Sequence, residues 1–96
     1  METQIFGNVW DALADSPEEA INLKMRSSLL VAIERRVQSW GVKQADAARR
    51  LGLTQPRLND LLRNKINNFS LDSLINIANS AGLDVQLHIG VKDIAA

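Results

Sequence analysis

Hydrogen-bonding side chains recur along a short segment between residues 55 and 63. Amide, carboxylate and guanidinium groups can bond to base edges in the DNA major groove, where glutamine suits adenine and arginine suits guanine. A helix that presents such groups on its outer face has the chemistry to read a DNA sequence. We therefore predict that four side chains face bases: Gln55, Arg57, Asn59 and Asp60. The alternative is a polar helix face exposed to solvent.

Basic and polar residues flank this segment at both ends. They are typical of contacts with the DNA backbone, which position a protein without reading sequence. We predict phosphate contacts from Lys43, Gln44, Thr54, Arg63 and Lys65.

The distribution of charge agrees with this prediction, although the chain has no net charge. Residues 24–65 contain ten Lys and Arg but three acidic residues, whereas residues 1–23 contain five acidic residues and no Lys or Arg. Positive charge is thus concentrated where a phosphate backbone would bind. Ordinary solvated helix faces would give the same counts. The acidic N-terminal block is either a solvated surface or a docking surface for a basic protein.

The predicted base-reading face needs two short helices to position it. The sequence indicates one helix from Lys43 to Leu51 and a second from Thr54 to Arg63, with Gly52 in the turn between them. The small side chain of Ala48 allows close approach of the helices. Residues 51, 53, 58 and 61 are leucines, which would fix the crossing angle. Thr54 is a good N-cap, Pro56 falls in the first turn, and Asn64 tolerates the left-handed conformation at a helix end.

Longer helices are expected on both sides of this pair. Ser16-Pro17-Glu18-Glu19 is a helix start, and the helix should run to Trp40, with Gly41 after it. Its buried stripe is predicted to contain Leu30, Ile33, Val37 and Trp40, extended by Ile21, Met25 and Leu29. Trp40 and Trp10 are interpreted as core residues rather than a binding platform. A further helix should begin after Ser70 and stop at Gly82, with Leu71, Leu74, Ile75 and Ala78 facing inward.

The periodicity changes after Gly82. Leu83, Val85, Leu87, Ile89 and Val91 alternate with polar residues or glycine, which is typical of a β-strand. A single strand leaves its backbone hydrogen bonds unmade, so we expect it to pair with the same strand of a second copy. The side chains predicted to form this dimer interface are Leu83, Val85, Leu87 and Ile89. Pairing with a different protein is the alternative.

Other classes of function find little support. The chain has no cysteine, and its one histidine, His88, falls on the polar side of the predicted strand. We therefore expect no catalytic site, metal site or cofactor, and no enzyme activity. No segment has the length of a membrane span or the pattern of a signal peptide, so a cytoplasmic protein is expected. Ninety-six residues suit one domain, 1–96, made of an N-terminal arm or short helix (1–15), a helical core (16–82) and a dimerisation strand (83–91).

The segment Q-A-D-A-A-R-R-L-G-L-T-Q-P-R-L-N-D-L-L-R-N-K, residues 44–65, resembles the Xre/Cro-type helix-turn-helix. G-N-V-W-D-A-L (7–13), F-S-L-D-S-L (69–74) and G-L-D-V-Q-L (82–87) extend the likeness to the HigA-like subgroup of antitoxins and regulators. The resemblance covers roughly residues 7–89, and T-Q-P-R-x-x-D-L is its most specific part. Two positions depart from the family pattern: Asn59 replaces a serine, which puts the base preference in doubt, and Asn64 replaces a glycine.

The resemblance implies an all-α, five-helix, lambda-repressor-like domain that binds a palindromic operator in double-stranded DNA as a homodimer and often represses its own operon. By position, it places Gln44 and Lys65 near phosphate and Gln55, Arg57 and Asp60 near bases. It also implies a small basic partner, a RelE/HigB-like ribonuclease toxin that an antitoxin neutralises. A stand-alone regulator without a toxin is the alternative.

Overall fold

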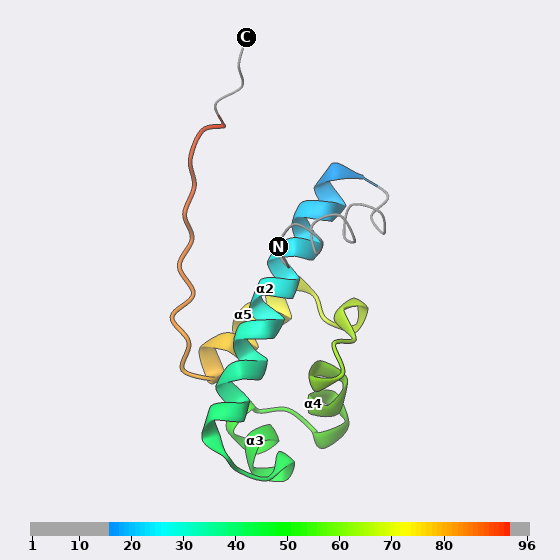
Figure 1. Cartoon of the computed structure of the whole chain (residues 1–96), viewed down its shortest axis with the longest axis vertical. Helices are drawn as coiled ribbons and strands as arrows, with labels where there is room; N and C mark the ends of the chain where they lie inside the picture. Colours follow the sequence, from blue (N-terminus) through cyan, green and yellow to red (C-terminus); the bar gives the residue numbers. More distant parts are fainter. Residues whose placement is uncertain (1–15, 93–96) are drawn as a thin grey trace.

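The computed structural model describes residues 16–92, and within that range all regular secondary structure is helical. Its four α-helices are α2 (Pro17–Trp40), α3 (Gln44–Leu51), α4 (Gln55–Leu62) and α5 (Leu71–Ser80), with a 3₁₀ turn, η1 (Ile66–Asn68), between the last two (Figure 1). The predicted all-α class is confirmed. The predicted arm or helix at 1–15 lies outside the described residues, so the fifth helix of the prediction is not shown.

Helix α2 begins and ends as its sequence indicates. Ser16 caps its start by accepting a hydrogen bond from the backbone N–H of Glu19 at 3.1 Å, and Pro17 follows where its missing N–H costs nothing. Gly41 ends the helix in the left-handed conformation, with φ of 61°. None of the helices described is both long enough and apolar enough to cross a membrane.

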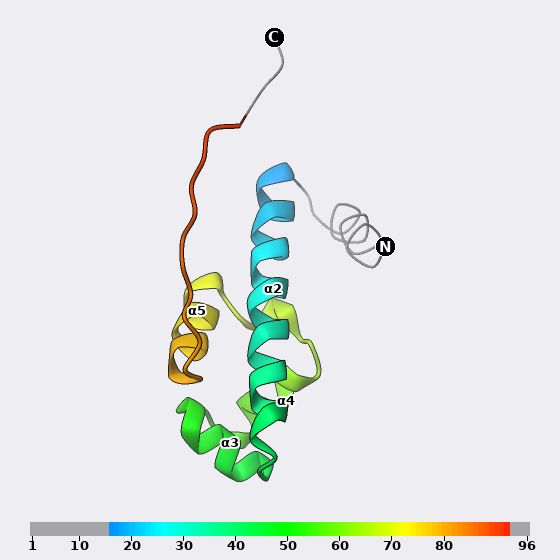
Figure 2. The same ribbon diagram turned by 60° about the vertical axis from the view of Figure 1, so that its left-hand side comes forward.

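The core lies where α2 and α5 pack together and α3 and α4 close the end (Figures 1 and 2). Its largest fully buried side chains are Ile33, Leu58, Leu61, Phe69 and Leu74. Ile33 belongs to the predicted stripe of α2, and Leu74 to that of α5. Burial of these side chains is the main driving force for folding a domain of this size.

The apolar stripes predicted for α2 and α5 are too wide. Ile21 and Met25 on α2 and Ile75 on α5 are exposed, and Leu29 is half-buried. The buried side of α5 instead includes Ile77. The helical period predicted which turns carry apolar residues, but an apolar face is buried only where another element covers it.

Helices α3, α4 and α5 end in the same way. After each helix, one residue has a positive φ: Gly52 (68°), Asn64 (60°) and Gly82 (81°). Two backbone hydrogen bonds accompany each of these residues, in the pattern of a Schellman motif. At the end of α3, Gly52 N donates to Arg49 O and Leu53 N to Ala48 O. At the end of α4, Asn64 N donates to Leu61 O and Lys65 N to Asp60 O. At the end of α5, Gly82 N donates to Asn79 O and Leu83 N to Ala78 O. The predicted roles of Gly52 and Asn64 are confirmed.

The C-terminal segment corrects the predicted strand. Residues 84–92 form neither helix nor strand in the single chain, and they run past α2 toward the end of the molecule opposite α3 and α4 (Figures 1 and 2). Leu83 still packs against the core, but Val85, Leu87, Ile89 and Val91 are exposed. A strand exists only as part of a hydrogen-bonded ladder, and the described part of this chain offers the segment no second strand.

Candidate nucleic-acid interface

Helices α3 and α4 form a compact pair joined by the turn at Gly52. Ala48 and Leu51 on α3 and Leu58 and Leu61 on α4 are buried between the two helices and the rest of the core. Ala48 is 2% exposed, which agrees with its predicted role at the close approach. Gly52 has open space around the position of a Cβ, so its requirement comes from its φ of +68° and not from crowding.

The two helices differ at their N-terminal ends. The hydroxyl of Thr54 caps α4 by accepting from the backbone N–H of Arg57 at 3.2 Å. The N-cap of α3, Lys43, makes no such side-chain bond. Lys43 and Gln44 are both exposed at that end. Backbone N–H groups at a helix start attract anions, so this end of α3 offers donors to a phosphate beside the side chains of Lys43 and Gln44.

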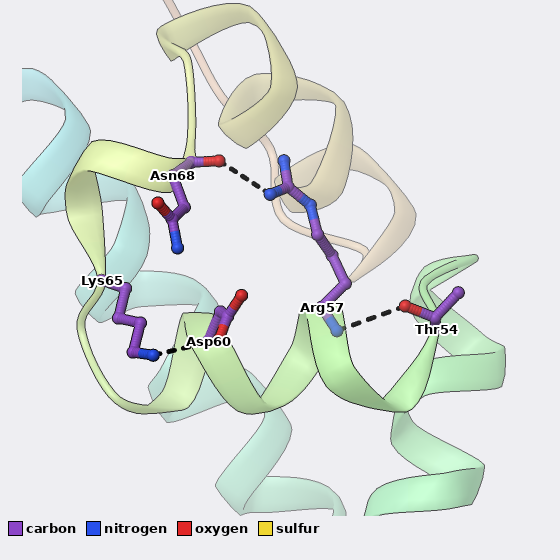
Figure 3. Close-up of polar contacts among 5 residues, drawn as sticks. All are labelled: Thr54, Arg57, Asp60, Lys65 and Asn68. Carbon is purple, nitrogen blue, oxygen red and sulfur yellow. Dashed lines mark hydrogen bonds and ion pairs between the residues drawn. The ribbon is translucent and has the colours of Figure 1, made fainter.

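The four residues predicted to face bases differ in exposure and in the contacts of their side chains. Gln55 is exposed at the first turn of α4, whereas Asn59 and Asp60 are half-buried along it. Arg57 is also half-buried, and its side chain extends toward the loop after α4 (Figure 3). Its Nη1 donates to the carbonyl oxygen of Asn68 at 2.7 Å.

The predicted phosphate contacts at the C-terminal end of α4 lie on an exposed surface. Arg63 and Lys65 are exposed, and Lys65 Nζ lies 3.6 Å from Asp60 Oδ1 (Figure 3). This ion pair is partly solvated, so it holds Lys65 weakly. The residues predicted for the dimer interface, from Leu83 to Ile89, are not brought to this site.

Two arginines of α2 have roles that the sequence did not reveal. Arg26 Nη1 donates to the carbonyl oxygens of Ile66 and Phe69 at 3.1 and 3.2 Å, and Arg36 Nε donates to that of Ala81 at 2.9 Å. These bonds join α2 to the two ends of α5. Part of the basic surplus of residues 24–65 therefore holds the fold together, and a count of charges could not show this because the partners lie at least 40 residues away.

The arrangement of α3, the turn and α4, supported by α2 and α5, is a helix-turn-helix DNA-binding domain. A family model for a helix-turn-helix domain matches residues 12–90. A solved structure assigned by name to the XRE family of transcriptional regulators is similar to this chain, with a TM-score of 0.71 and 30% sequence identity over 78% of this chain and 86% of the other. The search of curated proteins found no match.

The chain belongs to the Xre-type helix-turn-helix family of DNA-binding transcription regulators.

Proposed function

We propose that this regulator represses transcription as a homodimer that binds a palindromic operator, with α4 of each copy in the major groove. Repression would follow from occupation of the operator, and it would need no catalytic activity of the chain. The observation that carries the proposal is the polar face of α4, which begins at exposed Gln55 and continues through half-buried Asn59 and Asp60. These side chains have the donors and acceptors that base readout requires.

The ends of the helices support a phosphate-binding role for the surrounding residues. The uncapped start of α3 carries exposed Lys43 and Gln44, and exposed Arg63 and Lys65 follow α4. Thr54 is exposed between the two helices. Contacts from both sides of α4 would fix its register on the duplex, and each neutralised phosphate would make binding more sensitive to salt.

Readout by Gln55 is tested on an operator selected from random DNA. Gln55→Ala should weaken binding to that operator by about 1–3 kcal/mol and change binding to random DNA much less. Gln86→Ala is the matched control, because Gln86 is also exposed but lies in the C-terminal segment. Equal losses on both DNAs for Gln55→Ala would contradict base readout, and no preference of the wild type for any sequence would contradict the proposal as a whole.

The homodimer rests on the C-terminal segment. Leu87 and Ile89 are 82% and 79% exposed in the single chain, and they alternate with polar residues. Antiparallel pairing with a second copy would form backbone hydrogen bonds along the facing edges and bring the apolar side chains of the two copies into contact on one face. Because the segment runs away from α3 and α4, pairing would leave the DNA-binding surface free.

Two neighbouring substitutions test this interface. Leu87→Asp and Gln86→Asp each add one negative charge at an exposed position, but on opposite faces of an extended segment. Leu87→Asp should give monomers in sedimentation experiments, while Gln86→Asp should retain dimers. A dimer that survives Leu87→Asp would exclude the pairing of this apolar face.

We also propose that the regulator is the antitoxin of a toxin-antitoxin pair, which neutralises a RelE/HigB-like ribonuclease. Support comes from the HigA-like residues at 7–13, 69–74 and 82–87 and from the acidic N-terminal block, which suits a basic partner. The test is co-purification from the native host, followed by inhibition of the partner's ribonuclease activity with the purified chain. A regulator that binds its operator and copurifies with no ribonuclease would be the stand-alone alternative.

A further inference from the structure

Arg57 is held by the loop that follows α4. The guanidinium donates to Asn68 O at 2.7 Å, and its Cζ lies 4.0 Å from the centre of the Phe69 ring. At that distance the cation is attracted to the face of the ring. The backbone N–H of the same residue is bonded to Thr54 (Figure 3). One residue therefore joins the first turn of α4 to the segment beyond its last turn.

The loop that holds Arg57 is itself fixed to α2. Phe69 is 1% exposed, and its carbonyl oxygen, with that of Ile66, accepts from Arg26. Phe69 thus lies between two arginines, one bonded to its carbonyl and one stacked on its ring. The contacts form a continuous connection from α2 through the loop to α4.

Helix α4 depends on such connections for its orientation. Its eight residues make about two turns, and helices of this length are marginal without tertiary contacts. Leucines hold its inner side, and Arg57 supplies a polar attachment on the side toward α5. A shallow open pocket between the turn and α5 includes Arg57 among its lining residues, together with Leu53 and Asn76.

We propose that Arg57 is a positioning residue that sets the orientation of α4, and that base identity is read by its neighbours Gln55, Asn59 and Asp60. For Arg57 to contact a base, its guanidinium would have to leave both the carbonyl oxygen and the aromatic ring. The inference rests on the proposed function in one respect, the entry of α4 into the major groove.

The first test uses the full chain without DNA. Arg57→Met keeps the length and apolar stem of the side chain but removes the guanidinium. Amide hydrogen exchange should become faster in α4 and in residues 64–69, while the middle of α2 keeps its protection. Arg63→Met is the control, because Arg63 is an exposed arginine directly after α4 and its replacement should change neither region. Unchanged exchange in α4 and residues 64–69 of Arg57→Met would overturn the proposal.

The second test compares preferences at every base pair of the selected operator. Because each lost base contact weakens binding by about five-fold or more, a displaced α4 should lower the affinity of Arg57→Met by at least that factor. The order of preferred bases should stay the same, and Arg57→Lys should recover part of the affinity. Loss of preference at a single base pair would identify Arg57 as a base reader and overturn the proposal. If the wild type shows no sequence preference, the proposed function fails, while the exchange experiment still decides the role of Arg57.

Discussion

The α3–turn–α4 region and residues 84–92 differ in how many of their hydrogen bonds and apolar contacts are made within one chain. In the first region, Thr54 caps one helix start, and Schellman hydrogen bonds close both helix ends. In the second, a hydrogen bond joins the side chains of Gln86 and Asp84, while Val85, Leu87, Ile89 and Val91 are exposed to solvent. The comparison indicates that contacts within one chain hold the α3–turn–α4 region in place, whereas under the proposed dimer residues 84–92 would gain their contacts from a second copy.

Replacement of a leucine by alanine in each region should give the largest difference in the free energy of unfolding. Leu58→Ala should lower the free energy of unfolding by about 2–5 kcal/mol, since Leu58 is fully buried. Leu87→Ala should leave the stability of the monomer almost unchanged. Urea unfolding followed by circular dichroism, at a protein concentration low enough to give monomers, measures both. A large loss for Leu87→Ala under those conditions would mean that the segment packs within its own chain.

The difference between the regions also explains what the sequence could predict. Caps, turns and the leucines at 58 and 61 are local signals, and the structure has them where the sequence indicated. The direction of the Arg57 side chain depends on Asn68 and Phe69, and exposure of Ile21 and Ile75 depends on which elements fail to cover them. Such tertiary relations leave no periodic pattern. Alternation of apolar and polar residues predicts a strand at 83–91, but it indicates only how the segment would pair and not whether one chain supplies the partner strand.

A smaller effect should come from the turn. Gly52→Ala forces a side chain into a left-handed conformation that costs about 1–2 kcal/mol, although the space around it is open. The melting temperature should fall, and binding to the operator well below that temperature should change little if α4 keeps its place. A full loss of DNA binding by a folded Gly52→Ala protein would show that the turn also touches the duplex.

Asn64 allows the opposite change at the end of α4. It has φ of +60°, and it is the non-glycine residue with positive φ among residues 16–92. Asn64→Gly removes the steric cost of that conformation but adds freedom to the unfolded chain, so a net change of at most about 1 kcal/mol is expected. Asn64→Ala should be less stable than either. Thermal unfolding of the three proteins orders them, and a stability of Asn64→Ala equal to that of the wild type would contradict the role of the left-handed residue.

Breaking the Asp60–Lys65 ion pair should have the smallest effect on stability. The same substitutions distinguish a role of Lys65 in DNA binding from a role in the fold. The ion pair is partly exposed and should contribute at most about 1 kcal/mol. Lys65→Ala and Asp60→Asn both break it, so both should unfold at nearly the same temperature as the wild type. If Lys65 contacts phosphate, only Lys65→Ala should reduce the slope of log affinity against log salt, by roughly one unit. Asp60→Asn should instead change which base is preferred beneath α4. Equal salt slopes for Lys65→Ala and the wild type would remove Lys65 from the phosphate contacts and leave it as a surface partner of Asp60.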